Sequence, residues 1–250
     1  METETKISKL AEAITAAKHI VVLSGAGIST ASGIPDFRSE NGVYSKFERV
    51  EHLLSESYYH QHPKEFWINF KNIFQLQHMD SYEPNAAHTL LAELEKLDKK
   101  VTIVTQNVDG LHRKAGSTHI LEVHGTIASA HCPKCKASYS LAHVLQQEVP
   151  RCFSDNFILK PDVVLFGGGV QHLEEAYEFT QHCDLFLTLG SSLEVYPIKE
   201  LPYYASRAER PTTAIINMTA TPKDDLFDLV IHDELVATFT ELRKLLRLGH

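Results

Sequence analysis

The chain has 250 residues, of which 43% are hydrophobic and 22% are charged, a balance that supplies a core without disulfide staples and excludes long disorder. Its formal net charge of −8 argues against wholesale nucleic-acid binding, and no apolar run approaches the ~20 residues of a membrane helix. Because the N-terminus is acidic and polar, without a signal-peptide pattern, the sequence predicts a cytoplasmic protein that binds neither nucleic acid nor membrane.

Helix and strand signals alternate along most of the chain. The predicted elements, in order, are a helix over 7–17, a strand over 19–23, a helix over 86–97, strands over 101–105, 120–123 and 162–166, a helix over 174–180, a strand over 185–189, a helix over 201–210, a strand over 213–217 and a helix over 235–248. Strands joined through helices pair in parallel, so we expect a Rossmann-like α/β fold with a doubly wound, mostly parallel sheet. Ligands of such sheets bind at the carboxyl ends of the strands.

Two segments lack this alternation and predict a smaller inserted lobe. Residues 41–80 are rich in aromatic side chains and are expected to form short helices, and residues 127–160 hold three of the four cysteines. The predicted Rossmann-like domain therefore comprises residues 1–40, 81–126 and 161–250.

The cysteines of the lobe have the spacing of metal ligands. Cys132 and Cys135 form a Cys-x2-Cys pair, Cys152 follows after sixteen intervening residues, and Asp155 stands where a fourth cysteine would complete the set. Zinc also accepts carboxylate oxygen, so we expect a structural zinc site; the alternative is a site that has lost its metal. Cys183 lies before a strand and is expected to be an inert, packed thiol.

A glycine-containing loop follows the first strand. Gly25-Ala26-Gly27 is typical of a phosphate-binding turn, although such turns also occur without a ligand. Thr30 takes the place of the third glycine of Gly-x-Gly-x-x-Gly, and no acidic residue ends a second strand about 20 residues later. Both departures count against a hydride-transferring dehydrogenase.

Three polar sets go beyond what the fold requires. They are residues 33–39 after the glycine loop, and residues 106–110 and 122–125 after two apolar strands. Each set alone has a structural explanation, since Asn, Asp and Gly also cap helices and turns. Together they predict a single crevice lined by amides, carboxylates and one histidine.

With these sets the chain resembles the sirtuin family, and in detail its bacterial deacetylases. The matching motifs occur in family order over nearly the whole chain: Gly25–Ser29, Gly33–Arg38, Thr105–Asp109, His124–Gly125, Lys160–Val164, Gly190–Leu193 and Ile216–Asn217.

The resemblance implies an NAD⁺-dependent protein-lysine deacylase that transfers the acyl group to ADP-ribose and releases nicotinamide. It implies His124 as the general base, with Asn107 and Asp109 orienting the ribose and the nicotinamide amide. An imidazole suits this task because its usual pKa of ~6.5 leaves it largely neutral at cytoplasmic pH. Phe37 would shield the reacting face from water. The implied co-substrate is NAD⁺, and the implied partner is an acylated-lysine protein or peptide.

The resemblance also assigns contacts residue by residue. Arg38 would lie near the phosphates, residues 39–44 match a loop that orders over NAD⁺, and Val164 would hold the substrate lysine through its carbonyl. The implied substrate contacts are Val164, Phe166 and Gly167. The implied dinucleotide contacts are Gly25, Ala26, Gly27, Thr30, Asp36, Phe37, Arg38, Tyr44, Gln106, Asn107, Val108, Asp109, His124, Gly190, Ser191, Ser192, Asn217 and Met218.

Two departures from the family bear on the substrate. Gly167-Gly168-Gly169 stands where the family has Gly-Glu, which makes the cleft either more permissive or more costly to close. Residues 66–71 lack the Tyr and Arg of the desuccinylating branch, so we expect acetyl or longer aliphatic groups rather than succinyl. The aromatic residues Phe66, Trp67, Phe70 and Phe74 either pack in the core of the lobe or contact the acyl group.

Two other functions stay open at this point. A protein ADP-ribosyltransferase would use the same NAD⁺ site, although relatives of that kind tend to lack the histidine. A non-catalytic NAD⁺-sensing module would bind the dinucleotide without turnover. The acidic surface suits a lysine-bearing partner, but it is equally an ordinary means of solubility.

Overall fold

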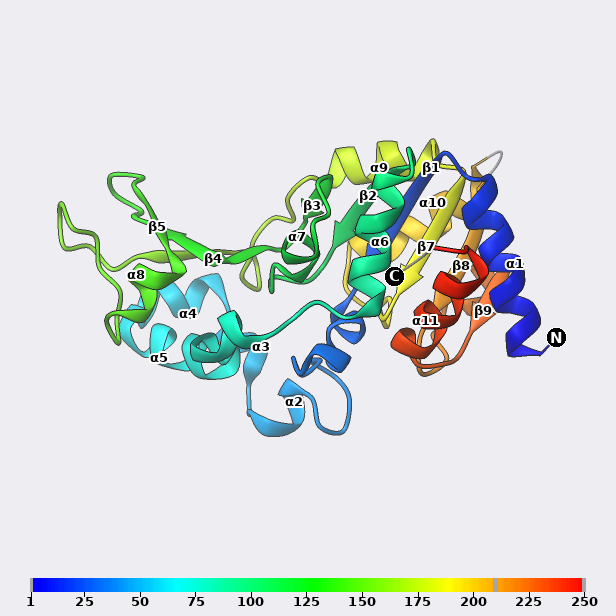
Figure 1. The fold of residues 1–250 in the computed structure, drawn as a ribbon. Coiled ribbons are helices and arrows are strands. Elements are labelled where there is room, and N and C mark those ends of the chain that lie inside the picture. Colours follow the sequence, from blue (N-terminus) through cyan, green and yellow to red (C-terminus); the bar gives the residue numbers. More distant parts are fainter. Residues whose placement is uncertain (1, 209–210, 249–250) are drawn as a thin grey trace.

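The larger domain of the protein is built on a parallel sheet (Figure 1). The computed structural model describes residues 2–208 and 211–248. The strand order of the sheet is β3-β2-β1-β7-β8-β9, and every neighbouring pair is parallel. The strands are β1 (His19–Ser24), β2 (Lys100–Thr105), β3 (Ile120–Glu122), β7 (Leu185–Leu189), β8 (Thr212–Ile216) and β9 (Leu229–Ile231). Strands β2 and β3 extend to one side of β1 and β7–β9 to the other, so the order reverses between β1 and β7.

Both faces of this sheet are buried because alternate strand residues point to opposite sides. Ile20 and Val22 belong to a core shared with α1, α6 and α11, whereas Val21 and Leu23 belong to a second core shared with α9 and α10. The helices are α1 (Thr3–Ala16), α6 (Ala86–Lys96), α7 (Leu111–Ala115), α9 (Leu173–Gln181), α10 (Leu201–Arg207) and α11 (Leu235–Leu245). The expected doubly wound α/β fold is confirmed.

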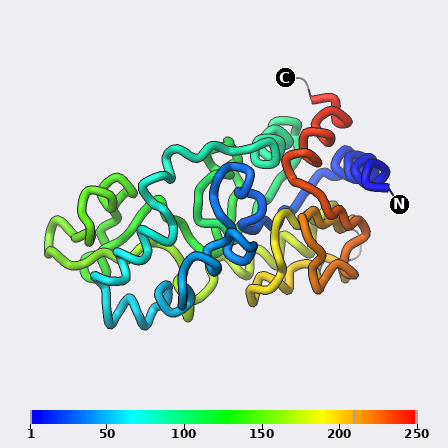
Figure 2. The backbone as a smooth tube through the Cα atoms, turned by 90° about the horizontal axis from the view of Figure 1, so that it is seen from below, coloured from blue at the N-terminus to red at the C-terminus, as the bar shows by residue number. Residues whose placement is uncertain are grey.

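A second sheet and a group of short helices form a lobe at one end of the elongated molecule (Figures 1 and 2). The sheet is antiparallel, with the order β5-β4-β6. Phe66, Trp67 and Phe70 lie at the centre of its core, each at most 1% exposed. The elements are α2 (Val43–Lys46), α3 (Val50–Leu53), α4 (Glu56–Gln61), α5 (Pro63–Ile73), β4 (Gly125–His131), β5 (Ser138–Ser140), α8 (Leu141–Leu145) and β6 (Lys160–Val163).

For one strand, the sequence predicted the wrong sheet. The run over 162–166, expected in the parallel sheet, appears as β6 (Lys160–Val163), which pairs antiparallel with β4 in the lobe. A short apolar run does not reveal its partner, and here Val163 and Leu165 pack into the core of the lobe. Strands β4, β5 and β9 were not predicted. The helix expected over 201–210 ends at Arg207, and residues 209–210 lie outside the described residues.

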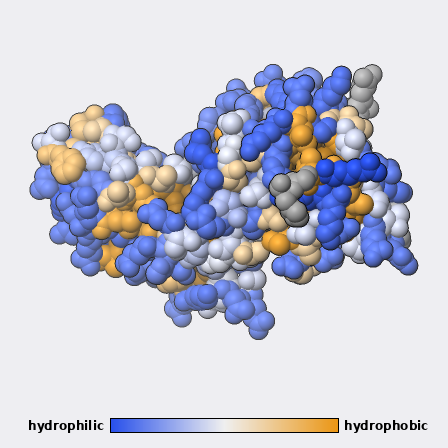
Figure 3. Space-filling model, viewed as in Figure 1, coloured by the Kyte–Doolittle hydropathy of each residue, from blue (hydrophilic) through white to orange (hydrophobic). Residues whose placement is uncertain are grey.

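The surface is polar over much of the face seen in Figure 3, with apolar patches over parts of the lobe and of the sheet domain. No described helix has both the length and the apolar character of a membrane span.

Candidate active site

The site begins where the strand order reverses, at the adjacent carboxyl ends of β1 and β7. The N–H of Gly27 donates to the carbonyl of Gly190 at 2.9 Å. Gly190 has φ of 59°, and a Cβ added there would lie 2.4 Å from the backbone nitrogen of Ile28. Two loops therefore pack backbone against backbone, which only glycine allows. The chain continues as two short 3-10 helices, η1 (Ala26–Ile28) and η2 (Thr30–Ser32), rather than the α-helix that usually follows a phosphate-binding turn.

A cavity of about 1080 Å³ extends from these loops toward the lobe. Every residue that the sequence predicted for the dinucleotide or the substrate lines this cavity, although the residues come from distant parts of the chain. They are Gly25, Ala26, Gly27, Thr30, Asp36, Phe37, Arg38, Tyr44, Gln106, Asn107, Val108, Asp109, His124, Val164, Phe166, Gly167, Gly190, Ser191, Ser192, Asn217 and Met218.

A buried serine connects the amide and the carboxylate that follow β2. The Ser29 hydroxyl donates to Oδ2 of Asp109 at 2.8 Å and accepts from Nδ2 of Asn107 at 3.2 Å. The backbone N–H of Leu111 donates to the other oxygen of Asp109 at 2.9 Å. Burial raises the pKa of the Asp109 carboxyl, and the hydrogen bonds from Leu111 and Ser29 oppose part of that rise. Ser29 thus fixes both side chains; its role was not foreseen, because serine is a common turn residue.

The imidazole of His124 has a defined tautomer. Its Nδ1 lies 3.0 Å from the carbonyl oxygen of Gln106, and since a carbonyl only accepts, Nδ1 carries the proton in the neutral ring. Burial lowers the pKa of His124, and the bond to the Gln106 carbonyl opposes part of this effect. Nε2 is therefore unprotonated near neutral pH. The side chain of Gln106 in turn accepts from the Ser191 hydroxyl at 2.9 Å, which links the ends of β2 and β7.

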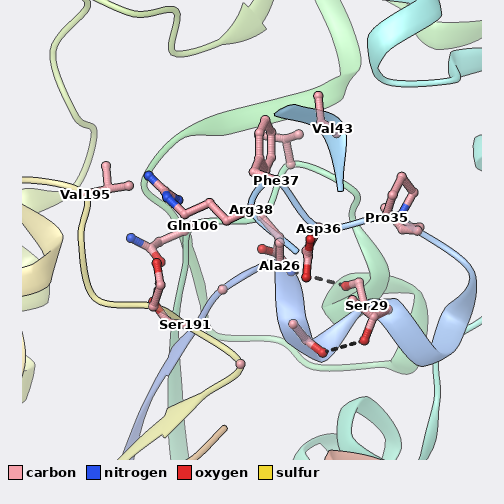
Figure 4. Close-up of a pocket in the computed structure, with 18 of the residues that line it drawn as sticks. Ala26, Ser29, Pro35, Asp36, Phe37, Arg38, Val43, Gln106, Ser191 and Val195 are labelled. Carbon is pink, nitrogen blue, oxygen red and sulfur yellow. Dashed lines mark hydrogen bonds between the residues drawn. The ribbon is translucent and has the colours of Figure 1, made fainter. Parts of the chain in front are cut away.

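The loop over residues 36–44 forms the opposite wall (Figure 4). Its turn is closed by Asp36, whose Oδ1 accepts from the N–H of Ser39 at 2.9 Å. Phe37 packs edge-on against Tyr44 and Phe74, with centroid separations of 5.9 and 6.4 Å.

The predicted substrate contacts lie on the lobe side of the cavity. The N–H of Val164 donates to the carbonyl of His124 at 2.8 Å, so this segment and the histidine are held together through the backbone. Gly167 has φ of 91°, a conformation that favours glycine, whereas a Cβ at Gly169 would meet nothing within 4 Å. Phe74 lines the cavity, but Phe66, Trp67 and Phe70 do not, so for these three core packing is confirmed.

The four predicted metal ligands converge within the lobe. One ligand atom from each of Cys132, Cys135, Cys152 and Asp155 lies within 4.8 Å of the others. The Cys135 and Cys152 sulfurs are 3.6 Å apart, and the Cys132 sulfur is 3.5 Å from Oδ1 of Asp155. Zinc–sulfur bonds of about 2.3 Å in a tetrahedron place ligands roughly 3.7 Å apart, so the set fits zinc. Cys183 is buried apart from this set, and burial raises its pKa to about 12, as expected for an inert thiol.

These features define a class: a Rossmann-like α/β protein with an inserted lobe and a nucleotide-sized crevice at the switch point of its sheet. Residues 25–197 match the model of the Sir2 family, and the chain belongs to that family, the sirtuins.

Similar proteins agree with this assignment. NAD-dependent protein deacetylase 2 of Geobacillus kaustophilus is 50% identical over 241 residues, which are 96% of this chain and 97% of the relative. The NAD-dependent protein deacetylase of Bacillus subtilis is 47% identical and covers 88% of this chain and 92% of its own length. A solved Sir2 structure with a p53 peptide and NAD⁺ has a TM-score of 0.83 and 32% identity, with 98% of both chains covered.

Proposed function

We propose that this chain is an NAD⁺-dependent protein-lysine deacetylase that transfers the acyl group to ADP-ribose and releases nicotinamide. The observation that carries the proposal is a half-buried, neutral imidazole at His124, held through Nδ1 and lining a crevice of dinucleotide size. The deacetylase names of its relatives and the peptide and NAD⁺ bound by a similar Sir2 structure support it.

In this reaction NAD⁺ supplies the ribose that receives the acyl group. Nε2 of His124 accepts the proton of a ribose hydroxyl, because its lowered pKa keeps the lone pair available at neutral pH. Asn107 and Asp109, fixed by Ser29, orient the ribose and the nicotinamide amide. The ring of Phe37, packed against Tyr44, excludes water from the reacting face.

Aliphatic acyl groups suit the lobe side of the cavity. Ile73, Phe74 and Ile127 contribute apolar side chains there, and among the described lining residues Arg38 is the single lysine or arginine. A succinyl carboxylate would need a cation of its own, so we propose that acetyl and longer aliphatic groups are preferred.

The lobe and the sheet domain have separate roles in this proposal. The predicted boundaries shift where β4 and the segment from β6 to Phe166 pack in the lobe. Residues 1–40, 81–124 and 167–250 then form the NAD⁺-binding domain, and residues 41–80 and 125–166 form the lobe. Zinc on Cys132, Cys135, Cys152 and Asp155 stabilises the lobe and takes no part in the chemistry. None of the four cysteines, all of which lie in the described residues, forms a disulfide, which suits a reducing compartment. We propose the cytoplasm, which fractionation of cells would test.

One experiment tests the proposed reaction. The wild type, His124→Ala and the control His60→Ala, whose side chain is 70% exposed, are incubated with an acetyl-lysine peptide with and without NAD⁺. We expect nicotinamide release that requires the peptide, is unchanged in His60→Ala and is lost in His124→Ala. Adenine label retained on protein without acyl release would indicate an ADP-ribosyltransferase, and NAD⁺ binding without turnover would indicate a sensing module; either result refutes the proposal.

A further inference from the structure

An ion pair crosses the cavity between two walls that are far apart in the sequence. Nε of Arg38, in the loop over residues 36–44, lies 2.7 Å from Oε2 of Glu194, in the loop after β7. Both side chains line the cavity, and they are 40% and 50% exposed. Figure 4 shows Arg38 extended across the site toward the segment that carries Ser191 and Val195.

The charge around this pair is unbalanced. Arg38 is the single lysine or arginine among the described lining residues. Besides Glu194, its guanidinium faces the ring of Tyr44, whose centroid lies 5.7 Å from the guanidinium carbon. Five carboxylates line the same cavity: Asp36, Asp109, Glu194, Asp233 and Glu234. A diphosphate entering this space therefore has one strong cationic partner, and that partner is already paired.

We propose that Glu194 sets the affinity for the dinucleotide by holding Arg38 until the diphosphate displaces it. This inference rests on the proposed function, because it takes NAD⁺ as the ligand. Carboxylate and diphosphate compete for the same guanidinium donors, so the energy of the ion pair is subtracted from the energy of binding.

Removal of the carboxylate should therefore tighten NAD⁺ binding. Partly exposed ion pairs contribute up to about 1 kcal/mol, which corresponds to a two- to fivefold lower Kd for Glu194→Gln. The control is Glu241→Gln, which removes the same charge from a side chain that pairs with Lys244 and does not line the cavity. Isothermal titration with NAD⁺ and with ADP-ribose, at low and at physiological salt, should give a gain for Glu194→Gln alone that shrinks as salt screens the pair.

A double-variant comparison separates displacement from general repulsion. In an Arg38→Gln background the substitution Glu194→Gln should no longer lower the Kd, since there is no guanidinium to release. A gain that persists in that background, an unchanged Kd, or weaker binding by Glu194→Gln each overturns the inference. A wild type without saturable NAD⁺ binding would instead refute the proposed function, so the two failures are distinguishable.

Discussion

Replacing Ser29 by alanine tests whether one hydroxyl organises the chemistry at the end of β2. Ser29 is fully buried, and its hydroxyl joins Asn107 to Asp109. The substitution removes a hydrogen bond to a carboxylate, worth about 1.5–3 kcal/mol, and a neutral one, worth about 0.5–1.5 kcal/mol. We expect the free energy of unfolding to fall by about 2–4 kcal/mol at neutral pH.

The pKa of Asp109 determines how the effects of Ser29→Ala on stability and on kcat/KM change with pH. Burial has already raised the pKa of Asp109, and loss of the Ser29 donor raises it further because the charged form loses a partner. Asp109 then has a higher pKa in the folded protein than in the unfolded chain, which lowers the free energy of unfolding wherever the unfolded chain is ionised. This loss of stability is full at neutral pH and shrinks as the pH falls through the folded-state pKa of Asp109. The acid limb of kcat/KM should move to higher pH for the same reason.

Urea denaturation across a pH series, together with a pH–rate profile, measures both effects. Ser206→Ala is the matched control, because its exposed hydroxyl donates to the Tyr203 carbonyl at 2.9 Å, outside the cavity. Stability and acid limb both unchanged in Ser29→Ala would refute the role assigned to this hydroxyl.

Four further predictions follow from single features. Gly190→Ala should separate the two loops, lower stability by at least about 1–3 kcal/mol and weaken NAD⁺ binding; normal titration and denaturation curves would contradict the packing. Because burial lowers the pKa of His124, kcat/KM should fall only below the usual histidine range of about 6.5, and an acid limb above it in a pH–rate profile would argue against this histidine as the base. Burial also lowers the pKa of His88 to about 4, so its share of stability should be complete above about 6.5 and be lost as the pH falls toward 4; a His88→Gln variant that shows the same loss in denaturation would exclude it as the source. Asp155→Ala should lower the zinc content, and Asp155→Cys should slow the loss of zinc to a chelator. Equal rates of zinc loss for the wild type and Asp155→Cys would mean that the carboxylate holds the metal as tightly as a thiolate.

Local pattern was enough to predict most of the sheet and the contents of the crevice. The strand over 185–189 was predicted to the residue, since four apolar residues interrupted only by Thr188 mark a strand buried on both faces. Gln106 and His124 could be placed together because both follow strands whose carboxyl ends share one edge.

Pairings across long sequence distances could not be predicted. Strand β6 pairs with β4 because its side chains pack in the lobe, and no local sequence pattern indicates this pairing. Ser29 and Glu194 carry ordinary turn and surface chemistry, and their contacts with Asp109 and Arg38 arise only when the fold brings distant loops together.

The position of His124 explains why the lobe matters to a reaction carried out at the sheet. Its Nδ1 is held by the carbonyl of Gln106 from the parallel sheet, and its own carbonyl accepts from Val164 at the end of β6. The next residue, Gly125, has φ of 76°, and a Cβ there would lie 2.0 Å from the carbonyl oxygen of Asp162. Strand β4 can therefore reach β6 only through a glycine directly after the histidine. Changes that loosen the lobe, loss of its metal included, therefore reach the base through this junction.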